Sequence, residues 1–485
     1  MLFFGFTLNM HKFSKEFVFT AIAILAISLF TVVSIFWSFN LLLYVFCFAI
    51  AGLAILKFPQ VGVYAIIFCT MVFERWFTLQ SLVWADQAIK FYPLDLIIVF
   101  TVISLFLHWK VGQRFVFAGK GLRWALWLWL AVITGSFIRS FSEVSADFSS
   151  SFSTFKNFAV YFVVYLLLVN IIKNKEQFDR MIKVMISAGV ILVYFIVYGL
   201  VSGQGIWVEY VPLSTPGTRL LGGPHSFYLT ALIIILINIL AFRSKWTKTE
   251  YFYLTLLGVF FVGLLASLQR HLWLALILGL AITFFYYQAE QRKKFFQMIG
   301  FGLLVLLFVA LLSFWLYSWQ TTNFLTDAEL THSLQFRLFS FFTAESQDSS
   351  AMWRLASWQS AWQVFSANPL WGIGFGKRLN FDISGLEYNI EMRDLHNDFV
   401  GMAVQMGFFG ILIILSLFYG LWRFFKNHYR KMLPEYKGHL LTFFTLAIMF
   451  LWSANFGIYF DINMLVVFFW VFLGSMVAVS RVGGK

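Results

Sequence analysis

The chain has 485 residues, of which 61% are hydrophobic and 12% charged, and its mean hydropathy is +0.82. Its 63 Phe, 19 Trp and 19 Tyr residues leave too little polar surface to cover a soluble core. This composition excludes a cytosolic enzyme and indicates a membrane protein. The net charge of +13 is therefore first explained by basic loops on one side of a membrane. The two cysteines, Cys47 and Cys69, lie in apolar stretches and predict neither a disulfide framework nor a metal site.

Apolar segments long enough to cross a bilayer recur along the whole chain. A transmembrane helix needs about 20 mostly apolar residues. By that measure the sequence predicts about fourteen spans, with approximate limits 17–37, 39–56, 59–78, 93–109, 122–138, 156–172, 181–201, 225–242, 251–268, 271–288, 296–318, 397–422, 439–456 and 458–480. The predicted fold is an all-α polytopic membrane protein with about 12–14 transmembrane helices.

Basic residues identify the cytoplasmic side of these spans. If the N-terminus is cytoplasmic and the sides alternate, most Lys and Arg residues fall in inner loops, as the positive-inside rule requires. The clearest inner groups lie within residues 110–123, 173–183, 243–248, 292–294 and 423–437. The positive charge thus follows the topology, and we expect no nucleic-acid partner.

One polar stretch, residues 319–395, is the only segment on the predicted outer side long enough to form more than a turn. The sequence therefore predicts a single membrane domain, residues 1–485, that carries residues 319–395 as a large helical cap. We expect the functional residues to lie in or beside this cap.

Two arginines near outer span ends require an explanation, because a charge at hydrocarbon depth costs roughly 2.5 kcal/mol or more. Arg270 occupies a very short outer hairpin, where it either snorkels to the interface or holds an anion. Arg219 lies in the Gly- and Pro-rich run 215–225, which either turns the chain or lets the backbone approach a ligand. His225, at the end of this run, is more simply a polar residue at a helix start than a catalyst.

The cap contains a predicted helix around residues 352–365. Its apolar residues recur at helical spacing and form one stripe: Leu355, Trp358, Trp362 and Phe365. This helix is expected to lie on the bilayer or to cap the bundle, and Arg354 lies one turn before Trp358. A Gly-x-Gly-x-Gly turn follows at Gly372, Gly374 and Gly376. Because no strand precedes it and no clear helix follows, it is a weak phosphate signal.

His396 stands where the cap returns to the membrane. It either caps a helix together with Asn397 and Asp398, or it acts as a base whose imidazole is oriented by the carboxylates of Asp394 and Asp398. Further along, Gly407 lies on a small-residue face that could admit a neighbouring helix.

These residues favour one kind of chemistry. The outer histidines form no metal-binding pair, and no Gly-x-Ser-x-Gly motif is present; they are His225, His271, His332 and His396. Arginines with one histidine suit transfer from a lipid-linked pyrophosphate, a good leaving group that needs charge stabilisation more than protonation. Histidine can accept the proton of an attacking sugar hydroxyl. The cap tryptophans could stack on sugars, and they are Trp353, Trp358, Trp362 and Trp371.

The motifs resemble those of the O-antigen ligase and polymerase family. The similar segments are Arg354-x-x-x-Trp358, the run 368–376, His396-Asn397 with Gly407 beyond it, Gln269-Arg270-x-x-Trp273, and Arg219 before Gly222 and Pro224. The likeness covers roughly residues 205–415. Ligases often carry Leu where this chain has Trp358.

The resemblance implies a GT-C-like, bacterial inner-membrane glycosyltransferase that takes a glycan from undecaprenyl pyrophosphate at the periplasmic face. It implies an inverting reaction without a metal or other cofactor. His396 would be the catalytic base, and Arg270, Arg354 and Arg219 would hold the pyrophosphate. Asp394, Asn397, Asp398, Trp358 and Gly407 would support them.

The resemblance leaves the acceptor open. A ligase uses lipid A core, a polymerase uses a second lipid-linked repeat unit, and an oligosaccharyltransferase uses a protein serine. The last usually has a larger C-terminal outer domain and is disfavoured because this chain ends at Lys485, soon after its last span. A transporter of lipid-linked sugars is a weaker alternative, since no internal repeat is found and the arginines gather at the outer edge.

Overall fold

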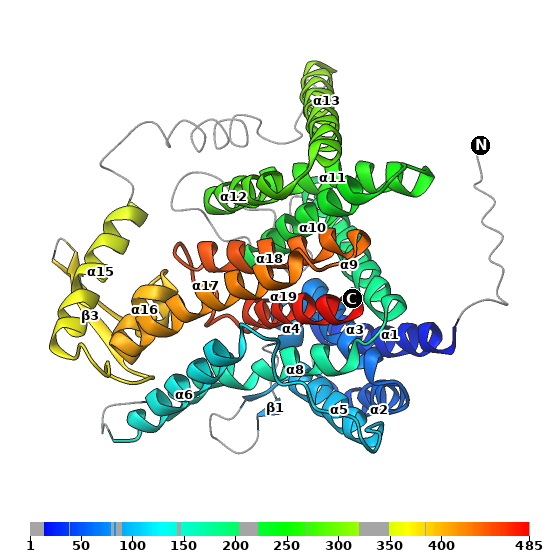
Figure 1. Cartoon of the computed structure of the whole chain (residues 1–485). Helices are drawn as coiled ribbons and strands as arrows, with labels where there is room; N and C mark the ends of the chain where they lie inside the picture. The colour runs from blue at the N-terminus through cyan, green and yellow to red at the C-terminus, as the bar shows by residue number, and fades with distance from the viewer. Residues whose placement is uncertain are drawn as a thin grey trace.

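The computed structural model describes residues 14–37, 39–78, 82–83, 90–142, 147–202, 222–267, 269–319, 349–383 and 385–484. Most of these residues belong to helices that pack into a bundle (Figure 1), so the predicted all-α membrane fold is confirmed. The cap lies at one end of this bundle.

The helices of the first half of the chain are α1 (Lys15–Phe36), α2 (Leu41–Lys57), α3 (Pro59–Phe73), α4 (Arg75–Thr78), α5 (Pro93–Leu107), α6 (Arg123–Ser140), α7 (Phe148–Phe155), α8 (Phe162–Ile171) and α9 (Lys175–Ser202). The second half contributes α10 (Gly223–Phe242), α11 (Lys248–Ala266), α12 (Arg270–Tyr286), α13 (Ala289–Trp319), α15 (Ser349–Ala367), α16 (Asp398–Met406), α17 (Phe408–Tyr429), α18 (Pro434–Ser453) and α19 (Asn463–Val482). Two antiparallel pairs of strands complete the fold: β1 (Leu82–Val83) with β2 (Lys90–Phe91), and β3 (Arg378–Ile383) with β4 (Leu386–Glu391).

The predicted spans coincide with helices because a lipid-exposed backbone must satisfy its own hydrogen bonds. Seven described helical segments are long and apolar enough to cross a membrane: α1, the continuous segment Phe148–Ile171, α9, α10, α11, α17 and α19. Shorter apolar helices match four more predicted spans, namely α2, α3, α5 and α12. The remaining three predicted spans overlap α6, α13 and α18. The chain is a multi-pass membrane protein.

Helix starts follow local sequence chemistry. Ser14 and Asn40 accept backbone N–H bonds at the starts of α1 and α2, and Thr247 and Glu250 form a capping box at α11. Four helices have Pro in their first turn, where its missing N–H costs nothing: α3, α5, α10 and α18.

A buried ion pair lies inside the segment Phe148–Ile171. One π-helical turn, η2 (Lys156–Val160), interrupts it and carries Lys156. Lys156 pairs with Asp95 of α5, and both side chains are only 10% exposed. The Lys156 ammonium also lies 4.1 Å from the centre of the Tyr92 ring. The two charges compensate each other where neither could remain alone.

Helix α19 runs through the middle of the bundle (Figure 1). Every residue from Asn463 to Ser480 is buried, and the helix packs against α8 and α18. The indole of Trp470 meets Phe162 at 5.1 Å and Trp129 of α6 at 5.8 Å between ring centroids. The loop before α19 is therefore attached to a fixed core.

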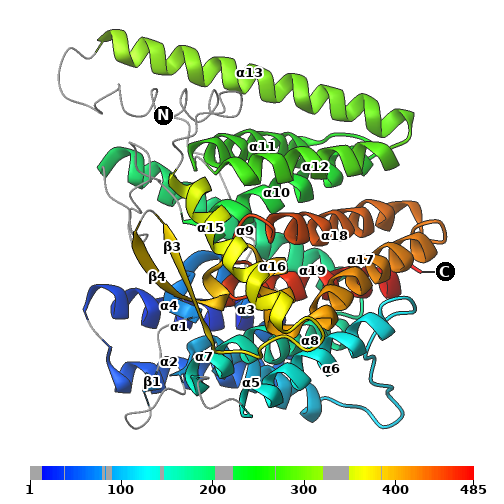
Figure 2. The same ribbon diagram turned by 90° about the vertical axis from the view of Figure 1, so that its left-hand side faces the viewer.

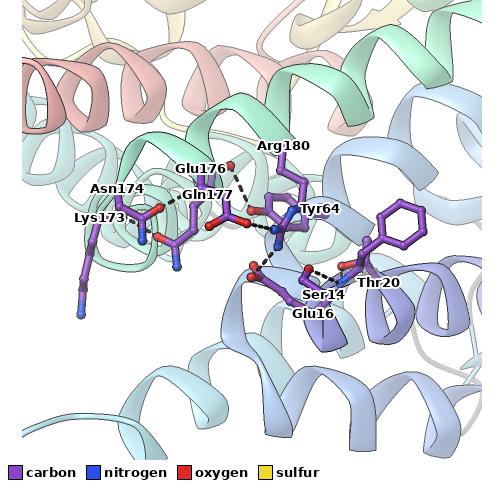
Figure 3. Close-up of polar contacts among 10 residues, drawn as sticks. Ser14, Glu16, Thr20, Tyr64, Lys173, Asn174, Glu176, Gln177 and Arg180 are labelled. Atoms are coloured by element: carbon purple, nitrogen blue, oxygen red, sulfur yellow. Dashed lines mark hydrogen bonds and ion pairs between the residues drawn. The ribbon is translucent and has the colours of Figure 1, made fainter. Parts of the chain in front are cut away.

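A polar clasp joins α1, α3 and α9 on the predicted cytoplasmic side (Figure 3). Arg180 of α9 pairs with Glu16 of α1 and, at 2.5 Å, with Glu176 of its own helix. The Tyr64 hydroxyl of α3 donates to the carbonyl oxygen of Gln177 at 3.0 Å. Arg180 and Glu16 are both largely buried, so each charge needs the other to compensate for its lost hydration.

The described part of the cap, residues 349–397, is built from α15 and the β3–β4 hairpin, with α16 beneath them (Figure 2). It encloses its own small apolar core: Ala361, Ile373, Leu379, Phe381, Met392, Leu395 and Val404. The cap is thus not purely helical, which corrects the prediction. Two residues of the predicted apolar stripe on α15, Leu355 and Trp362, are 65% and 66% exposed, whereas Ser357 and Ala361 on another face of the helix are buried.

The glycine turn attaches the cap to the bundle. Gly372, Gly374 and Gly376 all have positive φ, and their neighbours leave no room for a Cβ. The backbone N–H of Phe375 donates to Ser140 Oγ at 2.7 Å, and Ser151 Oγ donates to the Phe375 carbonyl at 3.0 Å. This turn is therefore a packing device between the cap, α6 and α7.

The predicted span 397–422 is broken at Gly407, which has φ of 63° and separates α16 from α17. A Cβ at Gly407 would lie 2.4 Å from the carbonyl oxygen of Leu370. The span proper is α17, and α16 belongs to the cap. The apolar sequence of α16 concealed this break because its residues pack into protein rather than lipid.

We expect Arg180→Ala to lower the free energy of unfolding by roughly 1–3 kcal/mol, because Glu16 is left partly buried without its partner. Thermal unfolding of the detergent-solubilised chain measures this as a reduced Tm. The control is Lys175→Ala, which breaks a pair with Glu435 whose side chains are more than half exposed and should cost about 0–1 kcal/mol. Equal Tm values for the two variants would contradict a stabilising clasp.

Candidate functional site

A large cavity lies between the cap and the nearby ends of the bundle helices. We call it the outer cavity, and its volume is about 800 Å³. Four parts of the chain form its wall: the start of α10, the α11–α12 hairpin, the cap, and the loop from α18 into α19. The lining residues are Gly223, Pro224, Gln269, His271, Met352, Trp353, Arg354, Ile383, Tyr388, His396, Phe456, Gly457, Ile458, Tyr459, Ile462 and Leu465.

His396 is exposed to this cavity. Its backbone has φ of 51°, an uncommon value for a residue other than glycine, because the chain turns sharply there between Leu395 and α16. Asn397 caps α16 by accepting the N–H groups of Phe399 and Val400 at 3.0 and 3.1 Å. The predicted capping role therefore belongs to Asn397, which leaves the imidazole of His396 directed to the cavity.

Burial and the nearby charge of Arg354 both lower the pKa of His396 below its usual value of about 6.5. The ring of Trp353 meets the imidazole edge-on, with ring centroids 5.3 Å apart. The neutral imidazole, which can accept a proton, is thus favoured at neutral pH.

Helix α15 brings Arg354 and Trp353 to the same wall. Trp358, one turn later, donates its indole N–H to the carbonyl oxygen of Leu395 at 3.1 Å. This bond fixes Leu395, the residue directly before His396, against α15, the helix that carries Arg354. Of the four cap tryptophans predicted to meet sugars, only Trp353 lines the outer cavity, and Trp362 and Trp371 are exposed elsewhere.

Asp398 has a different role from the one predicted. Its buried Oδ2 accepts the backbone N–H groups of Tyr459 and Phe460 at 2.7 and 2.8 Å, and its own N–H donates to the carbonyl of Ala454 at 2.9 Å. In the described structure neither Asp398 nor Asp394 hydrogen-bonds His396. Burial raises the pKa of both carboxyls. Asp398 therefore joins α16 to the α18–α19 loop.

The same loop reaches the α11–α12 hairpin. The Tyr459 hydroxyl lies 3.0 Å from His271 Nε2, and both residues line the outer cavity. The sequence marked residues 455–459 only as a break between two spans. Their contact with His271 and Asp398 could be found only in three dimensions.

The Gln269-Arg270-x-x-Trp273 motif shapes that hairpin. Gln269 is buried and donates to Ser226 of α10 at 3.1 Å, while the Trp273 indole donates to the carbonyl of Leu264 at 3.3 Å. Arg270 is the first residue of α12 and is half-buried. Its neighbours Gln269 and His271 line the outer cavity, whereas Arg270 does not.

The other predicted residues divide into two cases. Arg219 and His332 lie outside the described residues. His225 is completely buried in α10, where Glu74 accepts its backbone N–H at 3.0 Å and pairs with its ring. The structure therefore assigns His225 to helix packing, as the sequence favoured.

The outer cavity carries a consistent charge. Among the residues that the structure describes, its wall contains Arg354 and two histidines, His271 and His396, but no Asp or Glu. The start of α10 adds the positive end of a helix dipole at Gly223. This environment suits an anionic group placed beside a neutral imidazole.

Comparison with known proteins agrees with this geometry. The family model described as O-antigen ligase matches residues 254–415. The chain is also 24% identical to the O-antigen ligase of Salmonella typhimurium strain LT2 over 334 residues. This alignment covers 64% of this chain and 74% of that protein. The chain is thus similar to O-antigen ligases, both in the region 254–415 and over a longer alignment with one such protein.

The similarity to O-antigen ligases supports a ligase-like role in O-antigen and lipopolysaccharide biosynthesis, as a glycosyltransferase-type enzyme. The matched range runs from α11 to α17 and contains Arg270, Arg354, His396 and Gly407. It therefore includes the cap and the α11–α12 hairpin, while the start of α10 and the α18–α19 loop, which complete the wall, lie outside it.

We expect Arg354→Gln to raise the pKa of His396 toward 6.5, because the variant removes a positive charge that disfavours the imidazolium ion. The rise should be partial, since burial remains the larger cause. NMR titration of histidine-labelled protein measures it, with His396→Gln used to assign the signal. Arg378→Gln, in the exposed edge of β3, is the control cation. An unchanged titration midpoint of His396 in the Arg354→Gln variant would show that the charge of Arg354 does not affect His396.

Proposed function

We propose that this chain transfers a glycan from undecaprenyl pyrophosphate to a sugar hydroxyl of lipid A core at the periplasmic face of the bacterial inner membrane. The observation that carries the proposal is the outer cavity, where Arg354 and His396, whose pKa is lowered, share a wall that has no carboxylate among the described residues. The similarity to O-antigen ligases supports the ligase activity.

The arginines act on the pyrophosphate. Arg354 lines the cavity and supplies a fixed, always protonated fork that can bind phosphate oxygens in pairs. Arg270, one residue from two lining residues, and Arg219 assist it. As the bond from the sugar to the pyrophosphate breaks, these charges stabilise the developing negative charge on the leaving group. They do so without a divalent metal ion.

His396 acts on the acceptor. Its neutral imidazole takes the proton of the attacking hydroxyl while the hydroxyl oxygen forms a bond to the anomeric carbon of the donor sugar. The bond from that carbon to the pyrophosphate breaks on the opposite side, so the anomeric configuration inverts. Undecaprenyl pyrophosphate leaves with the bonding electron pair. Trp353 packs against the imidazole and limits its movement.

The supporting residues keep these groups in position. Asp398 and Asn397 fix the start of α16, Trp358 holds the residue before His396, and Gly407 permits the turn from α16 into α17. Asp394, whose carboxyl pKa is raised by burial, lies two residues before the base. Precise positioning of this kind accounts for much of the rate of an enzyme that needs no covalent intermediate.

The second candidate function is that of an O-antigen or exopolysaccharide polymerase, in which the acceptor is a second lipid-linked repeat unit. A polymerase would bind the donor pyrophosphate with the same residues. The resemblance to the ligase and polymerase family therefore supports both candidates equally as far as the donor is concerned. A transporter of lipid-linked sugars is a third and weaker candidate, because it gives no role to a base beside the phosphate-binding arginine.

We expect His396→Gln to reduce glycan transfer by at least about 100-fold, the usual contribution of a general base. Release of undecaprenyl pyrophosphate by purified chain in nanodiscs measures it. The control is His428→Gln, since His428 lies at the far end of α17 and bonds only its own helix at Phe424. Full activity of His396→Gln would remove histidine from the mechanism, and no release by the unaltered chain would favour transport.

We expect the same preparation to use lipid A core when each acceptor is offered separately with one donor. Ligation yields glycan-bearing lipid A core and one equivalent of free undecaprenyl pyrophosphate. Chain extension only with a second lipid-linked repeat unit would instead assign polymerase activity. Gel separation of the two products, with His396→Gln as the inactive control, distinguishes these outcomes.

A further inference from the structure

A second cavity adjoins the outer cavity. It has a volume of about 470 Å³, and we call it the side cavity. Pro224 and Ile462 belong to the walls of both cavities, so the two are direct neighbours. The side cavity is lined by Glu74, Tyr92, Ser149, Ser150, Phe152, Ser153, Lys156, Pro224, Arg393, Asp461, Ile462, Asn463 and Met464.

The two cations of the side cavity are already neutralised. Lys156 pairs with Asp95, and both side chains are 90% buried. Arg393 pairs with Glu391 and donates to Ser153 Oγ at 3.2 Å. Little positive charge is left to attract a phosphate, which distinguishes this cavity from the outer one.

One buried acceptor atom lacks a partner instead. Glu74 and Asp461 both line the side cavity, and Glu74 already accepts the backbone N–H of His225. The Oδ1 atom of Asp461 is buried and has no hydrogen-bond partner in the part of the chain that the structure describes. Burial raises the pKa of Asp461 to about 7, against an opposing effect of Arg393. A buried acceptor without a partner is costly, and a ligand hydroxyl would satisfy it.

The remaining polar residues both donate and accept. Three serines of α7 line the cavity: Ser149, Ser150 and Ser153. The amide of Asn463 and the rings of Tyr92 and Phe152 complete the wall. Hydroxyls, an amide, carboxylates and aromatic faces are together the complement of a neutral sugar, whose hydroxyls also donate and accept.

The same segments carry both cavities. Arg393 precedes His396 by three residues, and Asp461 follows Tyr459 by two. The π-helical turn that bears Lys156 widens α7–α8 at this level, and such turns are frequent at functional sites. A molecule whose phosphate lies in the outer cavity could thus extend directly into the side cavity.

We infer that the side cavity is a binding site for uncharged sugar residues of a substrate glycan, next to the pyrophosphate in the outer cavity. The inference rests on the proposed transferase function. The sugar belongs either to the donor glycan or to the acceptor, and the two share the same hydroxyl chemistry. On this inference, the outer cavity binds the charged pyrophosphate of the substrate, and the side cavity binds an uncharged sugar residue.

The test compares two donors on the detergent-solubilised full chain: undecaprenyl pyrophosphate alone and undecaprenyl pyrophosphate carrying a glycan. Asp461→Leu removes the unpartnered acceptor at similar size. We expect about a tenfold loss of affinity for the sugar-bearing donor and none for the bare lipid, because one hydrogen bond to a charged group is lost. If the site holds the acceptor sugar, donor affinity is unchanged and the KM for lipid A core rises about tenfold.

Two further variants keep the test decisive. Ser149→Phe fills the cavity from α7 and should give the same selective loss if Asp461→Leu does not fold. Asp382→Leu removes a carboxylate of the exposed β3–β4 hairpin and should change neither affinity nor KM. Equal loss for bare and sugar-bearing lipid, or no change in affinity or KM, would overturn the inference.

A different variant, Arg354→Gln, tests the proposed function. Arg354→Gln should weaken binding of the bare lipid and the sugar-bearing lipid alike. If Arg354→Gln leaves the bare lipid unaffected, the phosphate site is wrong, whatever Asp461→Leu does. The sugar site and the phosphate site are therefore tested independently.

Discussion

The buried carboxylate of Asp398 is the contact on which the outer cavity depends. It accepts two backbone N–H groups from the loop between α18 and α19, and so connects the cap to the central helix of the bundle. Two residues before it stands His396, and the loop it holds carries Tyr459, which meets His271. Three walls of the cavity are thus joined through one side chain. A shift of this carboxylate would move His396 away from the wall that faces it.

Separation of charge is the second organising feature. Within the described part of the chain, Arg354 and two histidines line the outer cavity without an acid, whereas the two cations of the side cavity are already paired with acids. Both cavities lie at the helix ends that the sequence predicts to be outer, where polar groups can be close to lipid without being dissolved in it. A substrate with an anionic centre between an apolar tail and a neutral glycan matches this order of environments.

Glycines let the cap lie close enough to the bundle for these contacts to form. The turn at Gly372–Gly376 approaches α6 and α7 more closely than a side chain would permit, and Gly407 turns α16 back into α17. The α15 helix then presents Arg354 to the cavity and leaves Leu355 and Trp362 exposed. Those two residues suit contact with the lipid interface, as expected for a helix lying on the bilayer.

The sequence alone determined the membrane class and the segments that form the helices, and it singled out Arg354 and His396, which both line the outer cavity, because hydrophobic length and short motifs are local properties of the chain. It could not determine that α16 ends at Gly407, since an apolar run has the same composition whether it faces lipid or a protein core. Nor could the sequence show that Asp398 contacts Tyr459, or that Lys156, Arg393 and Asp461 line one cavity, because these residues are far apart in sequence. Only the tertiary structure decided those contacts, since they arise from how helices pack rather than from what each helix contains.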